Sequence, residues 1–167
     1  MVPNVIRILG VDPGLRRTGW GLIDVTGSRL VYVACGVILS EAATSLAERL
    51  AQIHRSLTAL IESERPQEAA VEETFVNRDP QSALKLGQAR GVALAAPALM
   101  GLPVAEYSAN LIKKTVVGAG HAEKQQVMMM IKMLLPNAII ASPDAADALA
   151  VAITHAQHRG ARMRGAA

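Results

Sequence analysis

Carboxylates near the ends of predicted elements are the side chains of this sequence that could do chemistry. Asp12 ends a short apolar stretch, Glu72 and Glu73 lie side by side on another, and Asp144 and Asp147 stand three residues apart on a predicted helix. Acids brought together repel one another unless a cation or a proton offsets their charge. Hard oxygen ligands favour Mg²⁺ or Mn²⁺ over zinc, and a pair of such ions about 3.5–4 Å apart suits phosphoryl chemistry.

Some of these acids also have an ordinary structural explanation. Asp12 precedes Pro13-Gly14, and Asp-Pro-Gly is common turn chemistry. An acid near a helix N-terminus interacts favourably with the helix dipole, which accounts for Asp144. It accounts less well for Asp147, which lies deeper in an otherwise apolar helix. The choice between structure and chemistry depends on how the fold arranges the elements that carry the acids.

The first half of the chain predicts strands and then a helix. Residues 6–12, 18–25 and 29–39 are rich in β-branched and apolar residues, with a turn at residues 26–28, and they predict a three-stranded antiparallel meander. Ser45 and Glu48 form a capping-box pattern that opens a helix, and Pro66 stops it. Residues 69–74 predict a fourth strand, on which only one of Glu72 and Glu73 can face the side of Asp12.

The second half predicts mostly helices. After a polar loop over residues 77–80, residues 82–100 form a long helix, which Pro97 should kink or end early. Gly87, Gly91 and Ala95 give this helix a small-residue face, which either packs on its own sheet or forms a self-association surface. Residues 102–106 predict a fifth strand, and Ser108 caps the next helix.

The remaining elements end the chain. A methionine-rich helix is expected over residues 124–135, its methionines interpreted as core filler, and Ser142-Pro143 opens the last helix. The basic residues from 155 onward predict a loosely ordered tail. Together these elements predict an α/β protein with a mixed sheet and helices on its faces.

Composition sets the class of protein. The 167 residues fit one domain, and 51% hydrophobic against 19% charged residues exclude a disordered chain. Cys35 is the single cysteine, which excludes a disulfide framework and a cysteine-rich zinc site. The sequence lacks a signal-peptide pattern, so we expect a cytoplasmic protein. Residues 85–167 hold 9 Lys/Arg against 4 Asp/Glu, a weak indication of a polyanionic partner.

Five motifs, in order, closely resemble the RuvC family of bacterial Holliday-junction resolvases. They are GVDPGLRRTGWG, VEETF, SALKLGQARG, TVVGAGHAEK and DAADALAVA, spread over roughly residues 6–156. The resemblance implies an RNase H-like fold with a mixed five-stranded sheet, its first three strands antiparallel, and a homodimer. It also implies a Mg²⁺-dependent endodeoxyribonuclease, in which Mn²⁺ can substitute and each active site holds two ions. Such enzymes nick opposing strands of a four-way DNA junction symmetrically, leaving 5′-phosphate and 3′-hydroxyl ends.

The resemblance also assigns roles to single residues. It matches four acids to catalytic metal ligands: Asp12, Glu72 (which decides against Glu73), Asp144 and Asp147. It matches three more residues to DNA contacts, namely Phe75 to bases near the junction point and Lys113 and Lys124 to phosphates. It implies a role in recombination and repair together with the RuvA–RuvB branch-migration complex.

On this basis residues 1–157 form the nuclease domain and residues 158–167 a basic tail. Two other functions are compatible with parts of the sequence. A non-catalytic junction-binding module is one, although the intact acid set argues against it. A fragment of an actin-like ATPase is the other, but 167 residues are too few for both of its lobes, and a second phosphate loop is not evident.

Overall fold

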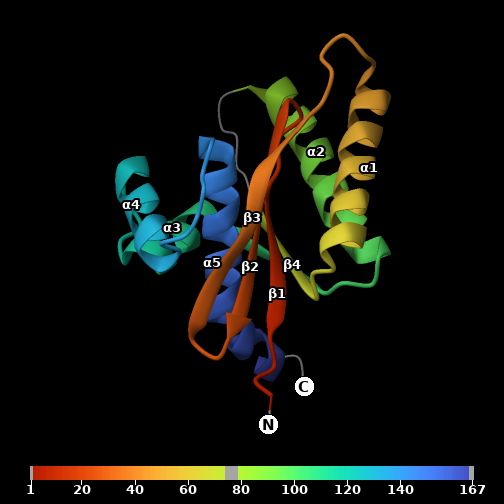
Figure 1. Ribbon diagram of the computed structural model, residues 1–167. Helices are drawn as coiled ribbons and strands as arrows, with labels where there is room; N and C mark the ends of the chain where they lie inside the picture. Colours follow the sequence, from red (N-terminus) through yellow and green to blue (C-terminus); the bar gives the residue numbers. More distant parts are fainter. Residues whose placement is uncertain (1, 74–78, 166–167) are drawn as a thin grey trace.

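A five-stranded sheet with helices on both faces forms the protein in the computed structural model, which describes residues 2–73 and 79–165 (Figure 1). Its elements in chain order are β1 Ile6–Asp12, β2 Arg17–Thr26, β3 Arg29–Leu39, α1 Leu46–Glu64, β4 Glu68–Glu73, α2 Pro80–Leu99, β5 Val104–Ser108, α3 Ala109–Val117, α4 Lys124–Leu134 and α5 Pro143–Gly165.

The strand order is β3-β2-β1-β4-β5. The first three strands pair antiparallel, whereas β4 runs parallel to β1 and β5 parallel to β4. This confirms the expected mixed sheet and its antiparallel meander, and the arrangement is RNase H-like. Because β1 lies at the centre of the sheet, Asp12 at its end is close to the ends of both neighbouring strands.

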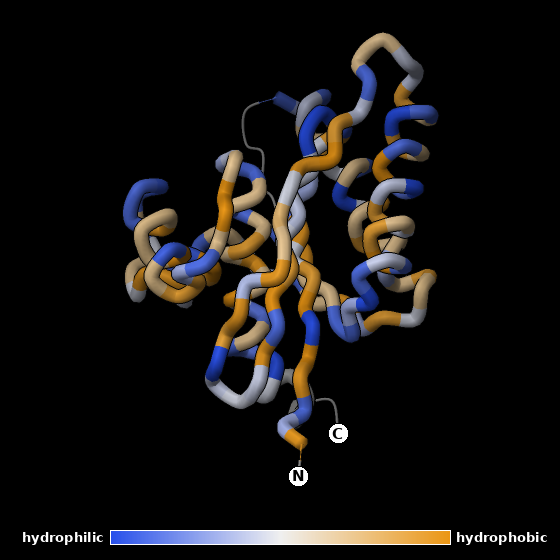
Figure 2. Tube along the Cα trace, in the orientation of Figure 1, coloured by the Kyte–Doolittle hydropathy of each residue, from blue (hydrophilic) through white to orange (hydrophobic). Residues whose placement is uncertain are grey.

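The two faces of the sheet carry separate apolar cores. Helix α5, with α3 and α4 outside it, lies on one side, and α1 and α2 lie on the other (Figure 1). Successive residues of β1 alternate between them: Ile8 packs towards α5, and Leu9 packs towards α1 and α2. Orange hydrophobic segments run along the central strands, as both-sided burial requires (Figure 2).

The same alternation decides which of the two neighbouring glutamates faces Asp12. In β4, Ala70 belongs to the α5 core and Val71 to the opposite core. Glu72 therefore points to the α5 side and Glu73 to the other side. Val11 is the register partner of Val71, so the next residues, Asp12 and Glu72, end neighbouring parallel strands on the same face.

Helix α5 approaches the sheet closely because glycines lie beneath it. A Cβ on Gly19 would overlap the backbone oxygen of Asp144, and a Cβ on Gly10 would lie 2.6 Å from the backbone nitrogen of Ala152. A Cβ on Gly21 would come within 2.8 Å of the Leu149 side chain. These three positions, hereafter the glycine track, let the helix backbone contact the strand backbone directly.

The helix caps largely follow the sequence. Ser45, Ser108 and Ser142 each accept a backbone N–H three residues ahead, as predicted for N-caps. The loop expected over residues 77–80 extends too far, because Pro80 is already the first residue of α2. The Asp79 carboxylate caps this helix by accepting a hydrogen bond from the Gln81 N–H at 3.1 Å.

Two expected boundaries differ from those of the structure. The fifth strand begins at Val104 and not at residue 102, and Pro103 before it only accepts a hydrogen bond, from the N–H of Ala69. The expectation of a loosely ordered tail is wrong for residues 158–165, because α5 runs on to Gly165 and the expected boundary at 157/158 falls inside the helix.

A buried ionic cluster holds the distal part of α5. Glu68, on the α5 side at the start of β4, forms an ion pair with Arg159 and accepts a hydrogen bond from the Nε2 of His155 at 2.7 Å. The other ring nitrogen of His155, Nδ1, lies 2.8 Å from the Tyr107 hydroxyl. These partners lower the pKa of Glu68, with the Arg159 hydrogen bonds as the largest cause. We call this group the Glu68 anchor.

The small-residue face of α2 does not pack on its own sheet. Ala89, Ala93 and Ala96 are buried against the core, whereas Gly87 and Gly91 are exposed, and a Cβ added at either glycine would meet nothing within 4 Å. Exposed Leu84 and Leu99 extend the same face. Pro97 lies buried in the last turn, and α2 ends two residues later at Leu99.

Hydropathy along the helices identifies no transmembrane segment. Within residues 2–73 and 79–165, none of the helices is sufficiently long and apolar to cross a lipid bilayer.

The glycine track gives the first testable prediction. We expect Gly19→Ala to destabilise the protein by about 1–3 kcal/mol, because the new methyl group would overlap the α5 backbone. Gly160→Ala in α5 is the control, since a Cβ there meets nothing within 4 Å and alanine favours helix by up to about 1 kcal/mol. Urea unfolding measures both, and equal stability of the two variants would contradict a close approach at Gly19.

Candidate active site

A cavity of about 260 Å³ opens where β1, β4 and α5 meet. Three acids line it together with two lysines and apolar residues of α3, α4 and α5; the lining residues are Asp12, Glu72, Asp147, Lys113, Lys124, Ala109, Ile112, Val127 and Ala150. Side chains from distant parts of the sequence therefore converge at one point, as the chemical interpretation of the acids requires.

Asp12 and Glu72 lie close to each other in the floor of this cavity, and the pKa of each is raised. Burial is the largest cause that raises the pKa of Asp12 to about 8, and the charges of Glu72 and Asp147 raise it further. Hydrogen bonding between the two carboxyl groups raises the pKa of Asp12 and acts to lower that of Glu72. Burial nevertheless leaves the pKa of Glu72 above its ordinary value. Two acids this close cannot both ionise without a compensating positive charge.

Asp147 faces the pair from α5. Burial raises its pKa, and the nearby charge of Asp144 acts in the same direction. Lys124 and Lys113 oppose this shift, and the same two lysines lower the pKa of Glu72. The lysines therefore offset part of the negative charge from the α3 and α4 side of the cavity.

Asp144 differs from the other acids, because it does not line the cavity. Its Oδ2 accepts a hydrogen bond from the Nε of Arg17 at 2.7 Å. Its charge still raises the pKa of both Asp12 and Asp147, so it lies near them. The four acids thus gather at one site, with Asp144 turned towards an arginine at its edge.

The donor set fits a hard divalent cation. The acids supply carboxylate oxygens only, and a cation between them would offset the repulsion that contributes to the raised pKa of Asp12. Within the described part of the chain, however, no three His, Cys, Asp or Glu side chains are already arranged to hold a metal ion. Asp12 and Glu72 now interact with each other, and Asp144 forms an ion pair with Arg17. A bound cation would have to replace both of these interactions.

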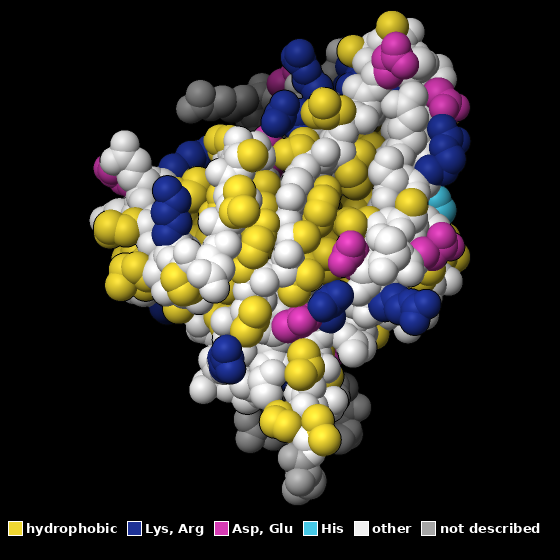
Figure 3. Space-filling view, in the orientation of Figure 1, with side chains coloured by type: hydrophobic (Ala, Val, Ile, Leu, Met, Phe, Trp, Pro, Cys, Tyr) yellow, Lys and Arg dark blue, Asp and Glu magenta, His cyan; other side chains and the backbone are white. Residues whose placement is uncertain are grey.

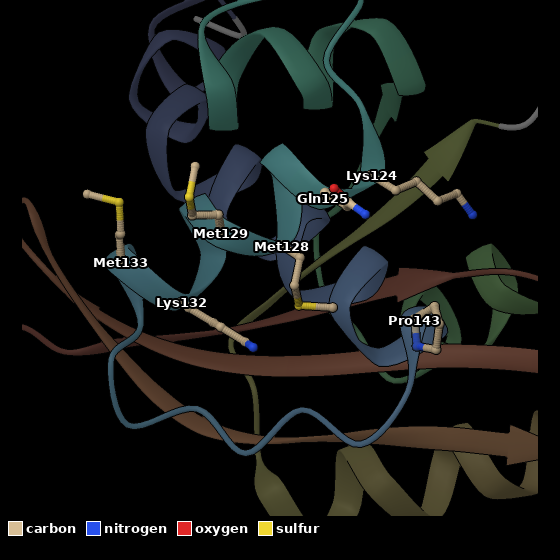
Figure 4. Close-up of a pocket in the computed structure, with 7 residues that line it drawn as sticks. All are labelled: Lys124, Gln125, Met128, Met129, Lys132, Met133 and Pro143. Atoms are coloured by element: carbon tan, nitrogen blue, oxygen red, sulfur yellow. The ribbon is translucent and has the colours of Figure 1, made fainter.

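A larger hollow of about 620 Å³ lies beside α4 and differs in chemistry from the acid cavity. Met128, Met129 and Met133 line it, with Lys124 and Lys132 at its sides (Figure 4). Met129 and Met133 are exposed, so the prediction that the methionines fill the core is wrong for these two, although Met128 and Met130 do pack against the core. The hollow contains no acid, and Lys124 is the residue that it shares with the acid cavity.

Surface character also differs across the molecule. Hydrophobic side chains lie across the middle of the view and at its left over α4, whereas acidic and basic side chains gather at the right over α1 (Figure 3). The candidate site is lined by residues of α3, α4 and α5 and therefore lies on the side of the sheet opposite α1.

Most of the predicted site residues are brought together. Asp12, Glu72, Asp147, Lys113 and Lys124 line one cavity. The prediction for Phe75 falls outside the described residues. Sequence reasoning missed Arg17, although a basic pair directly after the Asp12 turn was a visible signal that a counter-charge would lie beside the acids.

Comparison with known proteins shows the family to which the chain belongs. A family model described as "Crossover junction endodeoxyribonuclease RuvC" matches residues 8–155. A protein of that description from Xanthobacter autotrophicus is 68% identical over 98% of this chain and 97% of its own length. Another, from Methylocella silvestris, is 69% identical over 94% of this chain and 89% of its own.

The fold is also similar to a solved structure. It superposes on Thermus thermophilus RuvC in complex with a Holliday junction substrate with a TM-score of 0.86. The two sequences are 33% identical over 95% of this chain and 96% of the other.

The raised pKa of Asp12 gives a second prediction. A carboxyl whose pKa is raised from 3.8 to about 8 on folding makes its full contribution to stability at low pH and loses it progressively as the pH rises from about 4 to about 8. In EDTA at pH 9 we therefore expect Asp12→Asn to be more stable than wild type by about 2 kcal/mol, and the difference to vanish near pH 4. Urea unfolding at the two pH values measures this.

Glu73→Gln is the matched control, because that side chain lies on the opposite face of β4. It should show no comparable gain at pH 9. A wild-type protein as stable as Asp12→Asn at pH 9 would contradict the crowding of unbalanced acids at this site.

Proposed function

We propose a function on the premise that this chain belongs to the RuvC family of crossover junction endodeoxyribonucleases: it resolves four-way DNA junctions by hydrolysing one phosphodiester bond in each of two opposing strands. The observation that carries the proposal is the convergence of Asp12, Glu72 and Asp147 with Lys113 and Lys124 in one cavity. Carboxylates that need a cation, next to cations that can meet phosphate, form a site suited to metal-assisted phosphoryl transfer.

The carboxylates are the proposed metal ligands. Asp12, Glu72 and Asp147 would hold Mg²⁺, with Mn²⁺ able to substitute, and Asp144 would join them to complete a site for two ions. When bound, the ions supply charge neutralisation at the scissile phosphate and lower the pKa of a bound water. A bound divalent cation would offset the repulsion among these carboxylates, so that all of them could be ionised together.

The protein side chains orient the DNA. Lys113 and Lys124, which line the same cavity, are placed to neutralise phosphate oxygens while the acids position the attacking water. Water adds to phosphorus and the bond from phosphorus to the 3′ oxygen breaks, which leaves a 5′-phosphate and, after proton transfer, a 3′-hydroxyl. Phe75 is the proposed contact to bases at the junction point, a role that rests on the family resemblance.

A homodimer would place two such sites on one junction. The exposed face of α2, formed by Leu84, Gly87, Gly91, Ala95 and Leu99, supports self-association because small residues let another helix approach closely. Two sites related by a twofold axis would cut the opposing strands symmetrically.

In the bacterial cytoplasm this protein would act in recombination and repair. We also propose the RuvA–RuvB branch-migration complex as its partner. A non-catalytic junction-binding module is the second candidate, but the intact and crowded acid set argues against it, since the buried acids destabilise the fold without a cation. The actin-like ATPase interpretation gains no support from a cavity whose floor is made of carboxylates.

The central test of the proposal uses Asp147→Asn. We expect this variant to lose more than about 100-fold in cleavage rate, since it removes a ligand charge from the cavity, and to retain junction binding. The assay uses purified protein, Mg²⁺, a mobile four-way junction or several core sequences, and linear duplex as control. Paired symmetric nicks in the junction alone support the proposal.

Glu73→Gln serves again as the matched variant and should cleave like wild type. Tight junction binding without cleavage by wild type in either Mg²⁺ or Mn²⁺ would instead favour the binding module. Equal loss of binding and cleavage in Asp147→Asn would argue against a purely catalytic role for this acid.

The dimer proposal is tested by Gly91→Arg. A long charged side chain on the exposed α2 face should shift the protein to monomer in analytical ultracentrifugation and weaken paired nicking. Ala59→Arg, at an exposed position of α1, adds the same charge elsewhere and should leave the dimer intact. A dimer that survives Gly91→Arg would place the interface on another surface.

A further inference from the structure

Among the described residues, Arg17 forms an ion pair with Asp144, one of the candidate metal ligands. Its Nε donates to Asp144 Oδ2 at 2.7 Å across 127 positions of sequence. The Arg17 side chain is 46% exposed and that of Asp144 28% exposed, so the pair lies at the rim of the site and not in its floor.

The position of this pair explains why Asp144 does not line the cavity with the other acids. Arg17 is the first residue of β2 and stands next to the turn that follows Asp12. Its hydrogen bond to Asp144 is donated by Nε, and a guanidinium carries further N–H groups that can donate to other acceptors. The carboxylate of Asp144 is therefore neutralised by an arginine at the place where a cation would otherwise neutralise it.

We propose that Arg17 is a positioning residue that exchanges partners during the reaction: it holds Asp144 at the rim until a divalent cation takes over that carboxylate, and then binds a backbone phosphate of the junction DNA. The inference rests on the proposed function, since it assumes a metal-dependent nuclease. It deepens that function by coupling cation loading to substrate binding in a single side chain.

The chemistry favours both halves of the exchange. A surface ion pair is worth little, so a divalent cation with several carboxylate ligands can replace it. A guanidinium released beside bound DNA has a fork geometry that matches phosphate oxygens. Lys113 and Lys124 lie on the α3 and α4 side of the cavity, so Arg17 would add a phosphate contact from the β2 side.

The first test measures cation affinity without DNA. Free Mn²⁺ is followed by electron paramagnetic resonance during titration of wild type, Arg17→Met and Arg17→Lys. Loss of the competing arginine should tighten Mn²⁺ binding about two- to fivefold in Arg17→Met, with Arg17→Lys close to wild type. Arg55→Met removes an equivalent charge from an exposed pair with Glu48 on α1, and it should leave the affinity unchanged.

The second test measures junction binding. Fluorescence anisotropy of a labelled junction is recorded in Ca²⁺ and in EDTA, and denaturing gels check that the strands remain intact. In Ca²⁺, Arg17→Met should bind about three- to tenfold more weakly than Arg55→Met, and its salt dependence should have a slope lower by about one phosphate contact. In EDTA the two variants should bind alike, because Arg17 is then held by Asp144.

The outcomes separate this inference from the function on which it rests. Unchanged or weaker Mn²⁺ binding by Arg17→Met, or an equal loss of junction binding in Ca²⁺ and EDTA, would overturn the exchange even if wild type cleaves junctions. Absence of junction cleavage by wild type would overturn the proposed nuclease, while the Mn²⁺ comparison would still report on the Arg17–Asp144 pair.

Discussion

The direct contact between the α5 backbone and the glycine track is the constraint on which the rest of the structure depends. An ordinary helix is held away from a sheet by the side chains between them, but Gly10, Gly19 and Gly21 remove that spacing where β1 and β2 pass under α5. Gly19 is also the register partner of Asp12. Gly19, which allows α5 to approach the sheet, therefore lies directly beside Asp12. The same approach of α5 brings Asp144 and Asp147 close to Asp12.

Close approach has an electrostatic consequence. Carboxyl groups that would be solvated at a more open interface are instead buried near one another. The pKa of Asp12 is raised as a result, and lysines on one side and an arginine on the other offset part of the negative charge. The close packing of α5 on the sheet stabilises the fold, whereas the burial of several carboxyl groups at this site destabilises it. Such a compromise is typical of functional sites, where local strain is kept because it serves the chemistry.

Local chemistry made much of the fold predictable from sequence. The capping serines and Pro66 act over a few residues, so they made helix starts and the end of α1 predictable. The alternation of side chains along β4 likewise predicted that Glu72 and Glu73 face opposite sides of the sheet. What sequence could not supply depends on distant partners. The ordered end of α5 is held by Glu68 on β4, and the Arg17–Asp144 pair joins positions that no local pattern connects.

The Glu68 anchor and the acid site join α5 to β4 at two points. The distance between these two points must therefore be the same along the helix and along the strand. Glu72 and Glu68 are four residues apart on the strand, about 13 Å, while Asp147 and His155 are eight residues apart on the helix, about 12 Å. The helix and strand run in opposite directions, so both ends match at once. An inserted or deleted residue between these points would turn the helix by about 100° or move the strand side chains to the other face. Evolution can therefore change the identity of many residues here, but it can change the number of residues only in the loops.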